Sequence, residues 1–206
     1  MSQRTIYYSN DDGITWITFS NTLNVTSGQK ILFKGNNDTY SIQKDSTHTT
    51  RYYSFGGTAT FNASGNIMSM IGGNNFINIT TFGTFAFRSF FRNSNIINAK
   101  NLILPVTSLT ESCYNAMFYS CTNLIAAPTL PATTLVSNCY ASMFDGCSNL
   151  NYIKAMFTTG PDNMYTYRWV SGVSSTGTFV KNSAATWTTT GDTGVPTGWT
   201  VIIADS

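Results

Sequence analysis

The chain has 206 residues, of which 10% are charged, and its formal net charge is +2. A chain of this length can form one sizeable core, or a few small modules that share one. The small net charge and the lack of any lysine or arginine run exclude the phosphate attraction on which nucleic-acid binding depends. Serine, threonine, asparagine and glycine fill the polar positions, which is typical of extracellular or virion β-rich proteins. We therefore expect no nucleic-acid partner.

Residues 1–64 alternate short β-prone runs with turn signals. The runs TIYYS and ITWITF are separated by the turn-forming stretch NDDG, a pattern that predicts antiparallel strands. We expect an N-terminal β module over residues 1–64. The first residues also lack an apolar run of signal-peptide length, and no run of about 18 apolar residues follows. The sequence thus predicts neither export by the usual route nor membrane insertion.

A repeat of 26 residues occupies the centre of the chain. Residues 104–129, LPVTSLTESCYNAMFYSCTNLIAAPT, match residues 130–155, LPATTLVSNCYASMFDGCSNLNYIKA, in register. A diverged earlier copy begins at Phe85, and aligning Phe91 with Phe118 brings it into register. Internal repeats of this period indicate a solenoid. We expect about three units over residues 65–157.

The apolar residues within each unit form one stripe at helical spacing. In the first clear copy they are Cys113, Tyr114, Met117, Phe118 and Cys121. This spacing predicts a helix, and Ser108 with Glu111 has the separation of a capping box at its start. A short apolar run after each helix predicts a strand. The units therefore resemble leucine-rich repeats.

Residues 158–206 return to a β-prone pattern. The runs YRWVSGV, GTFVK and GWTVII are separated by turns rich in glycine, threonine and serine. We predict a C-terminal β cap here, because the ends of a solenoid must be covered. The expected fold class is α+β, with a short leucine-rich-repeat-like solenoid between β-rich N-terminal and C-terminal modules.

There are three arrangements to compare for the four cysteines: a metal site, a disulfide between layers, and buried free thiols. Cys113 and Cys121 are eight residues apart, about 12 Å along a helix, too far for one metal ion to bind both. A disulfide between layers, such as Cys113 with Cys139, is geometrically allowed. Buried free thiols pack well as small apolar groups, and we favour this arrangement for Cys113, Cys121, Cys139 and Cys147, although the sequence leaves their redox state open.

No pattern of catalytic residues is apparent. The only histidine, His48, lies in the Ser/Thr-rich stretch KDSTHTTR, and the usual nucleophile, zinc-protease and phosphate-loop motifs do not occur. The aspartates Asp11, Asp12, Asp38, Asp162 and Asp192 lie among turn-forming residues. We predict a protein that is not an enzyme and that uses no metal or cofactor. Tyr119, on the outer face of its unit, is instead expected to form a surface contact site with Arg88 and Arg92 of the neighbouring layer.

The unit LPxTxLxxxCYxxMFxxCxNL, the preceding GNIMSMIGGNNF and the tail WVSGVSSTGTFVKNSAATWTTTGDTGVPTGWTV together resemble the BspA-like leucine-rich-repeat surface proteins of gut Bacteroidales and their phages. That resemblance implies a noncatalytic solenoid used for adhesion and for protein or glycan contact. The chain differs from the bacterial members in having about three repeats and no export signal.

These differences favour a phage structural protein located in the virion, such as a head fibre, decoration or tail component. Its expected partners are other virion proteins, a host surface protein or glycan, and further copies of itself. The alternative is an adhesin or glycan-binding module on the bacterial cell surface.

Overall fold

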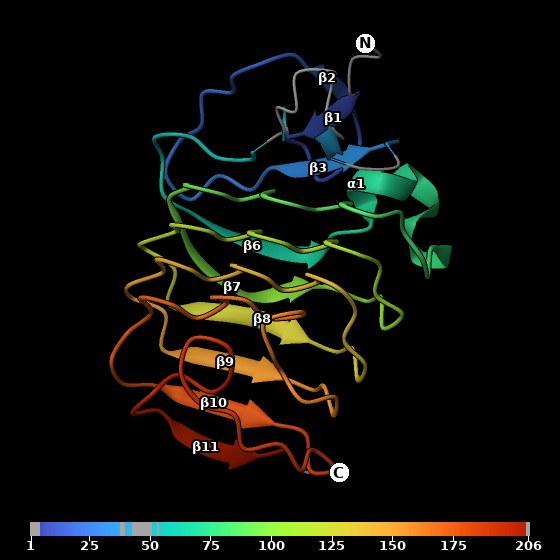
Figure 1. Ribbon diagram of the computed structural model, residues 1–206. Helices are drawn as coiled ribbons and strands as arrows, with labels where there is room; N and C mark the ends of the chain where they lie inside the picture. Colours follow the sequence, from blue (N-terminus) through green and yellow to red (C-terminus); the bar gives the residue numbers. More distant parts are fainter. Residues whose placement is uncertain (1–4, 38–39, 43–50, 53, 205–206) are drawn as a thin grey trace.

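The computed structural model describes residues 5–37, 40–42, 51–52 and 54–204. Its main feature is a six-stranded parallel sheet in which every strand pairs with the next along the chain (Figure 1). The strands, in order, are β6 (Phe61–Asn66), β7 (Ile96–Ile103), β8 (Ala126–Leu130), β9 (Tyr152–Ala155), β10 (Thr178–Lys181) and β11 (Thr200–Ile203). Stacking of one strand per layer makes this part of the chain a parallel β-solenoid, which confirms the predicted solenoid.

The second wall of the solenoid consists of linked turns, so the prediction of a helix in each unit is wrong. Residues 111–120 are turns, with positive φ at Ser112 (54°), Ala116 (53°) and Ser120 (55°). Backbone N–H groups alternate in direction along this stretch. That of Asn115 donates within the layer, to Ser112 O at 3.2 Å, and that of Ala116 donates to Ala141 O of the next layer at 2.8 Å.

The helix prediction failed because two periods are nearly the same. Each set of four residues in the linked turns places two side chains inside and two outside, whereas a helix repeats every 3.6 residues. Over the nine residues from Cys113 to Cys121 the two periods select the same inward positions. The predicted inward side chains are therefore buried, as expected, but the backbone that carries them is not helical. Among the described residues the fold is mostly β, with one short α-helix, rather than α+β.

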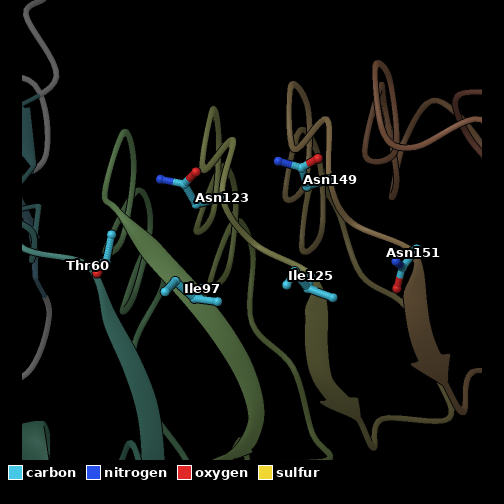
Figure 2. A pocket seen from close by; sticks show the side chains of 6 residues that line it. All are labelled: Thr60, Ile97, Asn123, Ile125, Asn149 and Asn151. Atoms are coloured by element: carbon cyan, nitrogen blue, oxygen red, sulfur yellow. The ribbon is translucent and has the colours of Figure 1, made fainter. Parts of the chain in front are cut away.

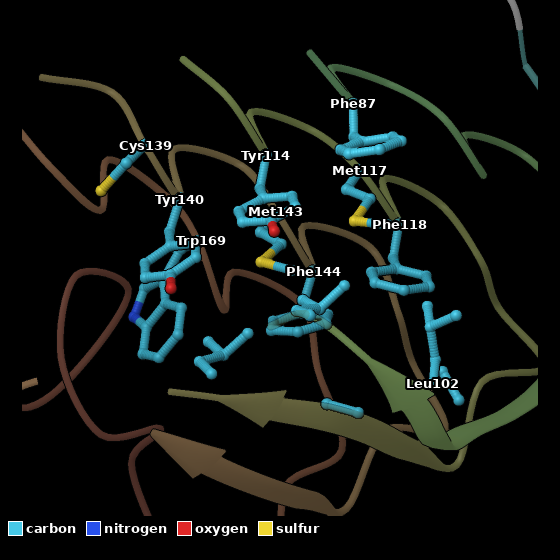
Figure 3. Close-up of a cluster of buried hydrophobic side chains, with 14 of the residues drawn as sticks. Phe87, Leu102, Tyr114, Met117, Phe118, Cys139, Tyr140, Met143, Phe144 and Trp169 are labelled. Carbon is cyan, nitrogen blue, oxygen red and sulfur yellow. The ribbon is translucent and has the colours of Figure 1, made fainter. Parts of the chain in front are cut away.

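Aromatic ladders fill the space between the two walls (Figure 3). Phe91, Phe118 and Phe144 stack with ring centroids 5.3 and 5.6 Å apart. Next to them, Tyr114 stacks on Phe87 at 6.1 Å and on Tyr140 at 6.0 Å. The predicted alignment of Phe91 with Phe118 is confirmed, and the stacked rings hold successive layers in one register.

The N-terminal part of the chain lies at the first layer of the stack (Figure 1). It contains an antiparallel sheet in the order β2-β1-β3, whose strands are β1 (Ile6–Ser9), β2 (Ile17–Phe19) and β3 (Leu32–Gly35). Two further strands, β4 (Ser41–Ile42) and β5 (Arg51–Tyr52), form a separate pair. The α-helix α1 (Ser69–Gly72) and a 3₁₀ helix (Gly73–Asn78) follow β6 in the chain. Tyr40 stacks on Phe87 at 6.1 Å, and its N–H donates to Ala86 O. This region therefore covers the core at one end. β6 crosses the predicted module boundary at residue 64 and belongs to the solenoid.

The C-terminal strands extend the same parallel sheet instead of forming the predicted separate cap. Thr178 of β10 pairs with Tyr152 of β9, and Thr200 of β11 pairs with Thr178. β10 is displaced from β9 by 26 residues, the spacing of the sequence repeat, although its sequence does not match the repeat. Among the described residues, no helix has the length and apolar character needed to cross a membrane.

Candidate functional site

The predicted surface residues lie on the outer side of the linked turns. The guanidinium carbon of Arg92 is 4.0 Å from the centre of the Tyr119 ring in the next layer. Arg88 instead lies over Phe85, with 5.7 Å between its guanidinium carbon and the ring centre. The structure therefore brings Arg92 and Tyr119 together, in a cation–π contact of the kind that contributes about 0.5–1 kcal/mol at exposed sites.

The same surface carries an ion pair in the following layers. Asp145 aligns with Tyr119, because Ser120 N–H donates to Asp145 O. Arg168 Nε lies 3.1 Å from Asp145 Oδ2, and Nη2 lies 3.4 Å from Oδ1. The outer turn surface thus carries arginine over tyrosine in its earlier layers and an arginine–aspartate ion pair in its later layers.

A second candidate is an open groove where the turns lead into the strands (Figure 2). Its volume is about 430 Å³, and it crosses several layers. The lining residues are all uncharged: Thr60, Ile97, Asn123, Ile125, Asn149 and Asn151. Ile125 N–H donates to Ile97 O, and Asn151 N–H donates to Ile125 O, so these three residues occupy equivalent positions in adjacent layers.

An asparagine ladder forms one side of this groove. Asn149 Nδ2 donates to Thr122 O at 2.8 Å, and Asn123 Nδ2 donates to Asn95 Oδ1 at 3.4 Å. Each amide therefore bonds toward the preceding layer, which stabilises the stack. Amide groups beside an isoleucine floor also suit an uncharged polar ligand such as a sugar, because amides both donate and accept hydrogen bonds. The repeated Asn-Leu pair of the sequence was the available signal for this ladder.

The four cysteine thiols are free and buried, as we favoured from the sequence. Cys121 Sγ donates to Phe91 O at 2.9 Å, and Cys147 Sγ donates to Phe118 O at 3.0 Å. Burial raises the pKa of Cys113 from 9.0 to about 12 and that of Cys139 from 9.0 to about 11. Because the thiolate is the reactive form, these thiols are held in their unreactive state at neutral pH.

We expect the folded protein to lose stability as the pH rises above about 9. Unfolded thiols release their protons near pH 9.0, whereas folded Cys113 and Cys139 hold theirs to about pH 12 and 11. The unfolded state thus binds fewer protons in this window, so each thiol lowers the free energy of unfolding by about 1.4 kcal/mol per pH unit. Urea titrations at several pH values measure the slope, and Cys139→Ala should make it shallower. An unchanged slope in that variant would contradict the assignment.

Two of the described aspartates, Asp11 and Asp162, take structural roles in turns. Asp11 accepts hydrogen bonds from the hydroxyls of Ser9 and Thr15, which lower its pKa to about 2. Asp162 accepts the N–H of Met164 at 2.7 Å. Glu111 is exposed and, with no helix present, does not form the expected capping box; its carbonyl accepts Phe85 N–H.

His48 lies outside the described residues, as does Asp38. Within the described part of the chain, no three His, Cys, Asp or Glu side chains lie together in a way that suits a metal ion. Searches against protein-family models, curated proteins and solved structures find no match to this chain.

Proposed function

We propose that the protein is a noncatalytic structural component of a phage virion, such as a head fibre, decoration or tail protein. The observation that carries this proposal is the use of the repeated residues: rings, thiols and amides serve contacts between layers. These repeated side chains are thus committed to structure, and the stacked layers offer a repetitive surface. The sequence resemblance to BspA-like proteins of Bacteroidales and their phages supports the same class.

The partners in this proposal are other virion proteins or a host surface protein, contacted through the outer turn surface. Arg92 stacked on Tyr119 provides an ordered cationic and aromatic group there, and residues of these two types dominate the energetics of many protein interfaces. An Arg92→Ala/Tyr119→Ala variant should therefore weaken partner binding while the core remains intact.

Purified phage particles provide the test of this proposal. Mass spectrometry of particles banded on a density gradient should detect the protein in a fixed ratio to the major capsid protein. Particles treated with nuclease and high salt serve as the control against adhering host protein. Detection of the protein only in the bacterial envelope fraction would contradict the virion assignment.

The groove favours a second candidate, a glycan-binding module on the bacterial surface. Its amides and isoleucines are uncharged and extend across several layers, which suits an extended neutral glycan. A glycan array should then give a hit with the wild-type protein that is lost in Asn123→Ala/Asn149→Ala. A hit of equal strength in that variant would exclude this groove as the site.

A further inference from the structure

The last strand of the solenoid leaves an open apolar edge. β11 ends the six-stranded sheet, pairing with β10 on one side and with no other described strand. All four of its residues are exposed, with 45% exposure at Val201, 49% at Ile202 and 53% at Ile203. Figure 1 shows this strand at the opposite end of the stack from the N-terminal sheet. Among the described residues, one end of the solenoid is therefore covered and the other is open.

Two of the exposed side chains of β11 lie on the face of the sheet that points to the core. Val201 pairs with Phe179 and Ile203 pairs with Lys181, and both of these β10 residues are buried. Since side chains alternate between the faces of a strand, Val201 and Ile203 point to the core side and Ile202 points to the outer side. Val201 and Ile203 are exposed because no further layer covers them among the described residues.

The backbone of β11 is also available for pairing. Thr200 N–H donates to Gly177 O at 2.9 Å, and Ala204 N–H donates to Lys181 O at 2.8 Å. Alternation along the strand then directs the N–H and C=O groups of Val201 and Ile203 to the free edge. Edge strands are usually protected by a charge, a proline or a bulge. Residues 200–203 carry no charge or proline, and their pairing with β10 is regular.

We propose that a second copy of this chain pairs with β11, in antiparallel orientation, about a two-fold axis through Ile202. In this register Val201 lies opposite Ile203 of the partner subunit, and Ile202 lies opposite Ile202 of the partner subunit. Core-facing residues then meet core-facing residues, and outer-facing residues meet each other. The groups of Val201 and Ile203 form four hydrogen bonds across the axis, because those residues become the hydrogen-bonded pairs.

The chemistry of this end favours a second copy over a charged partner. β11 itself carries no charge, and Asp192 and Asp205 are the only charged side chains that follow Lys181 in the sequence, so two identical ends meet with little electrostatic repulsion. The apolar side chains of each copy also cover those of the other. A two-fold interface uses both free edges and closes the assembly as a dimer. This inference names one surface for self-association, and it does not rest on the proposed virion role.

A single cysteine substitution tests both the surface and the register. Residues opposite each other in a non-hydrogen-bonded antiparallel pair have Cα atoms about 4.5 Å apart, within the range that a disulfide spans. Ile202→Cys should therefore form a covalent dimer on mild oxidation, seen on a non-reducing gel. The native thiols are buried and give no background. Ile77→Cys is the control, since Ile77 is 76% exposed and lies far along the chain from β11.

Light scattering of the unmodified protein provides the independent measurement. The wild type should show twice the monomer mass, and Val201→Lys/Ile203→Lys should show the monomer mass with an unchanged circular dichroism spectrum. If the wild type is still a monomer at a protein concentration of 100 µM (about 10⁻⁴ M) or above, its dissociation constant is larger than that of a specific interface, and the proposal is overturned. Equal cross-linking at residues 77 and 202 would overturn the register. Neither result bears on whether the protein is found in virions.

Discussion

Phe118→Ala is expected to lower the free energy of unfolding by about 3–5 kcal/mol, the usual range for removing a buried ring. Phe118 is fully buried and stacks on Phe91 at 5.3 Å and on Phe144 at 5.6 Å. Its removal leaves a cavity between two layers that the neighbouring rings cannot close, because hydrogen bonds between layers hold both of them in place. Chemical denaturation followed by circular dichroism measures the loss.

Asn115→Ala is the matched control for this substitution. Asn115 lies three residues away in the same linked turns and is partly exposed, and its carbonyl oxygen accepts the N–H of Ser89 in the preceding layer. We expect its substitution to change the free energy of unfolding by less than about 0.5 kcal/mol. Similar losses in the two variants would mean that the inward and outward faces are wrongly assigned.

Ala116→Val is expected to destabilise the protein by about 2–4 kcal/mol, from backbone strain together with overpacking. Ala116 has φ of 53° and is only 5% exposed. A β-branched side chain is strongly disfavoured at positive φ, and the buried site has little room for two more carbon atoms. Thermal and urea denaturation of the purified variant measure the effect.

Ala116→Gly distinguishes the linked turns from a helix. Glycine adopts positive φ without strain, so this variant should be within about 0.5 kcal/mol of the wild type, or slightly more stable. In the interior of a helix, glycine would lower stability by about 1 kcal/mol relative to alanine, and valine by less than that. A glycine variant that is less stable than the valine variant would therefore contradict the turn geometry.

The sequence was sufficient to predict that the repeat units stack as layers, but it predicted neither the path of the backbone within them nor the continuation of the same sheet through β10 and β11. Near identity between the two clear repeat copies gave the alignment of Phe118 with Phe144, and matching the diverged earlier copy to the same pattern placed Phe91 over Phe118, because units that stack must place equivalent residues over one another. The sequence did not indicate the turns, because glycine is the usual signal for the left-handed conformation and the residues that adopt it here are Ser112, Ala116 and Ser120. Only Gly146, which follows Ser120 in the same column, carried that signal in the repeat.

The surface features were harder to predict than the core. The groove contains Ile97, Ile125 and Asn151, which come together only when the layers are stacked in their final register. Its Asn123 and Asn149 belong to the repeat, but a repeated asparagine is equally consistent with a turn. The sequence placed both Arg88 and Arg92 beside Tyr119, because the four-residue period and the helical period assign the outward positions in the same way; in the structure Arg92 lies over the Tyr119 ring and Arg88 over the Phe85 ring.

The N–H groups of the linked turns alternate between bonds within a layer and bonds to the next layer, so a layer can be added without changing the contacts of the others. Both walls bond each layer to the next, so a layer makes the same contacts wherever it lies in the interior of the stack. Duplication of residues 130–155 would lengthen the molecule by about 4.8 Å, one strand spacing, while the two ends kept their own contacts. Evolution and protein design can therefore change the length of such a molecule in equal steps, without rebuilding its two ends.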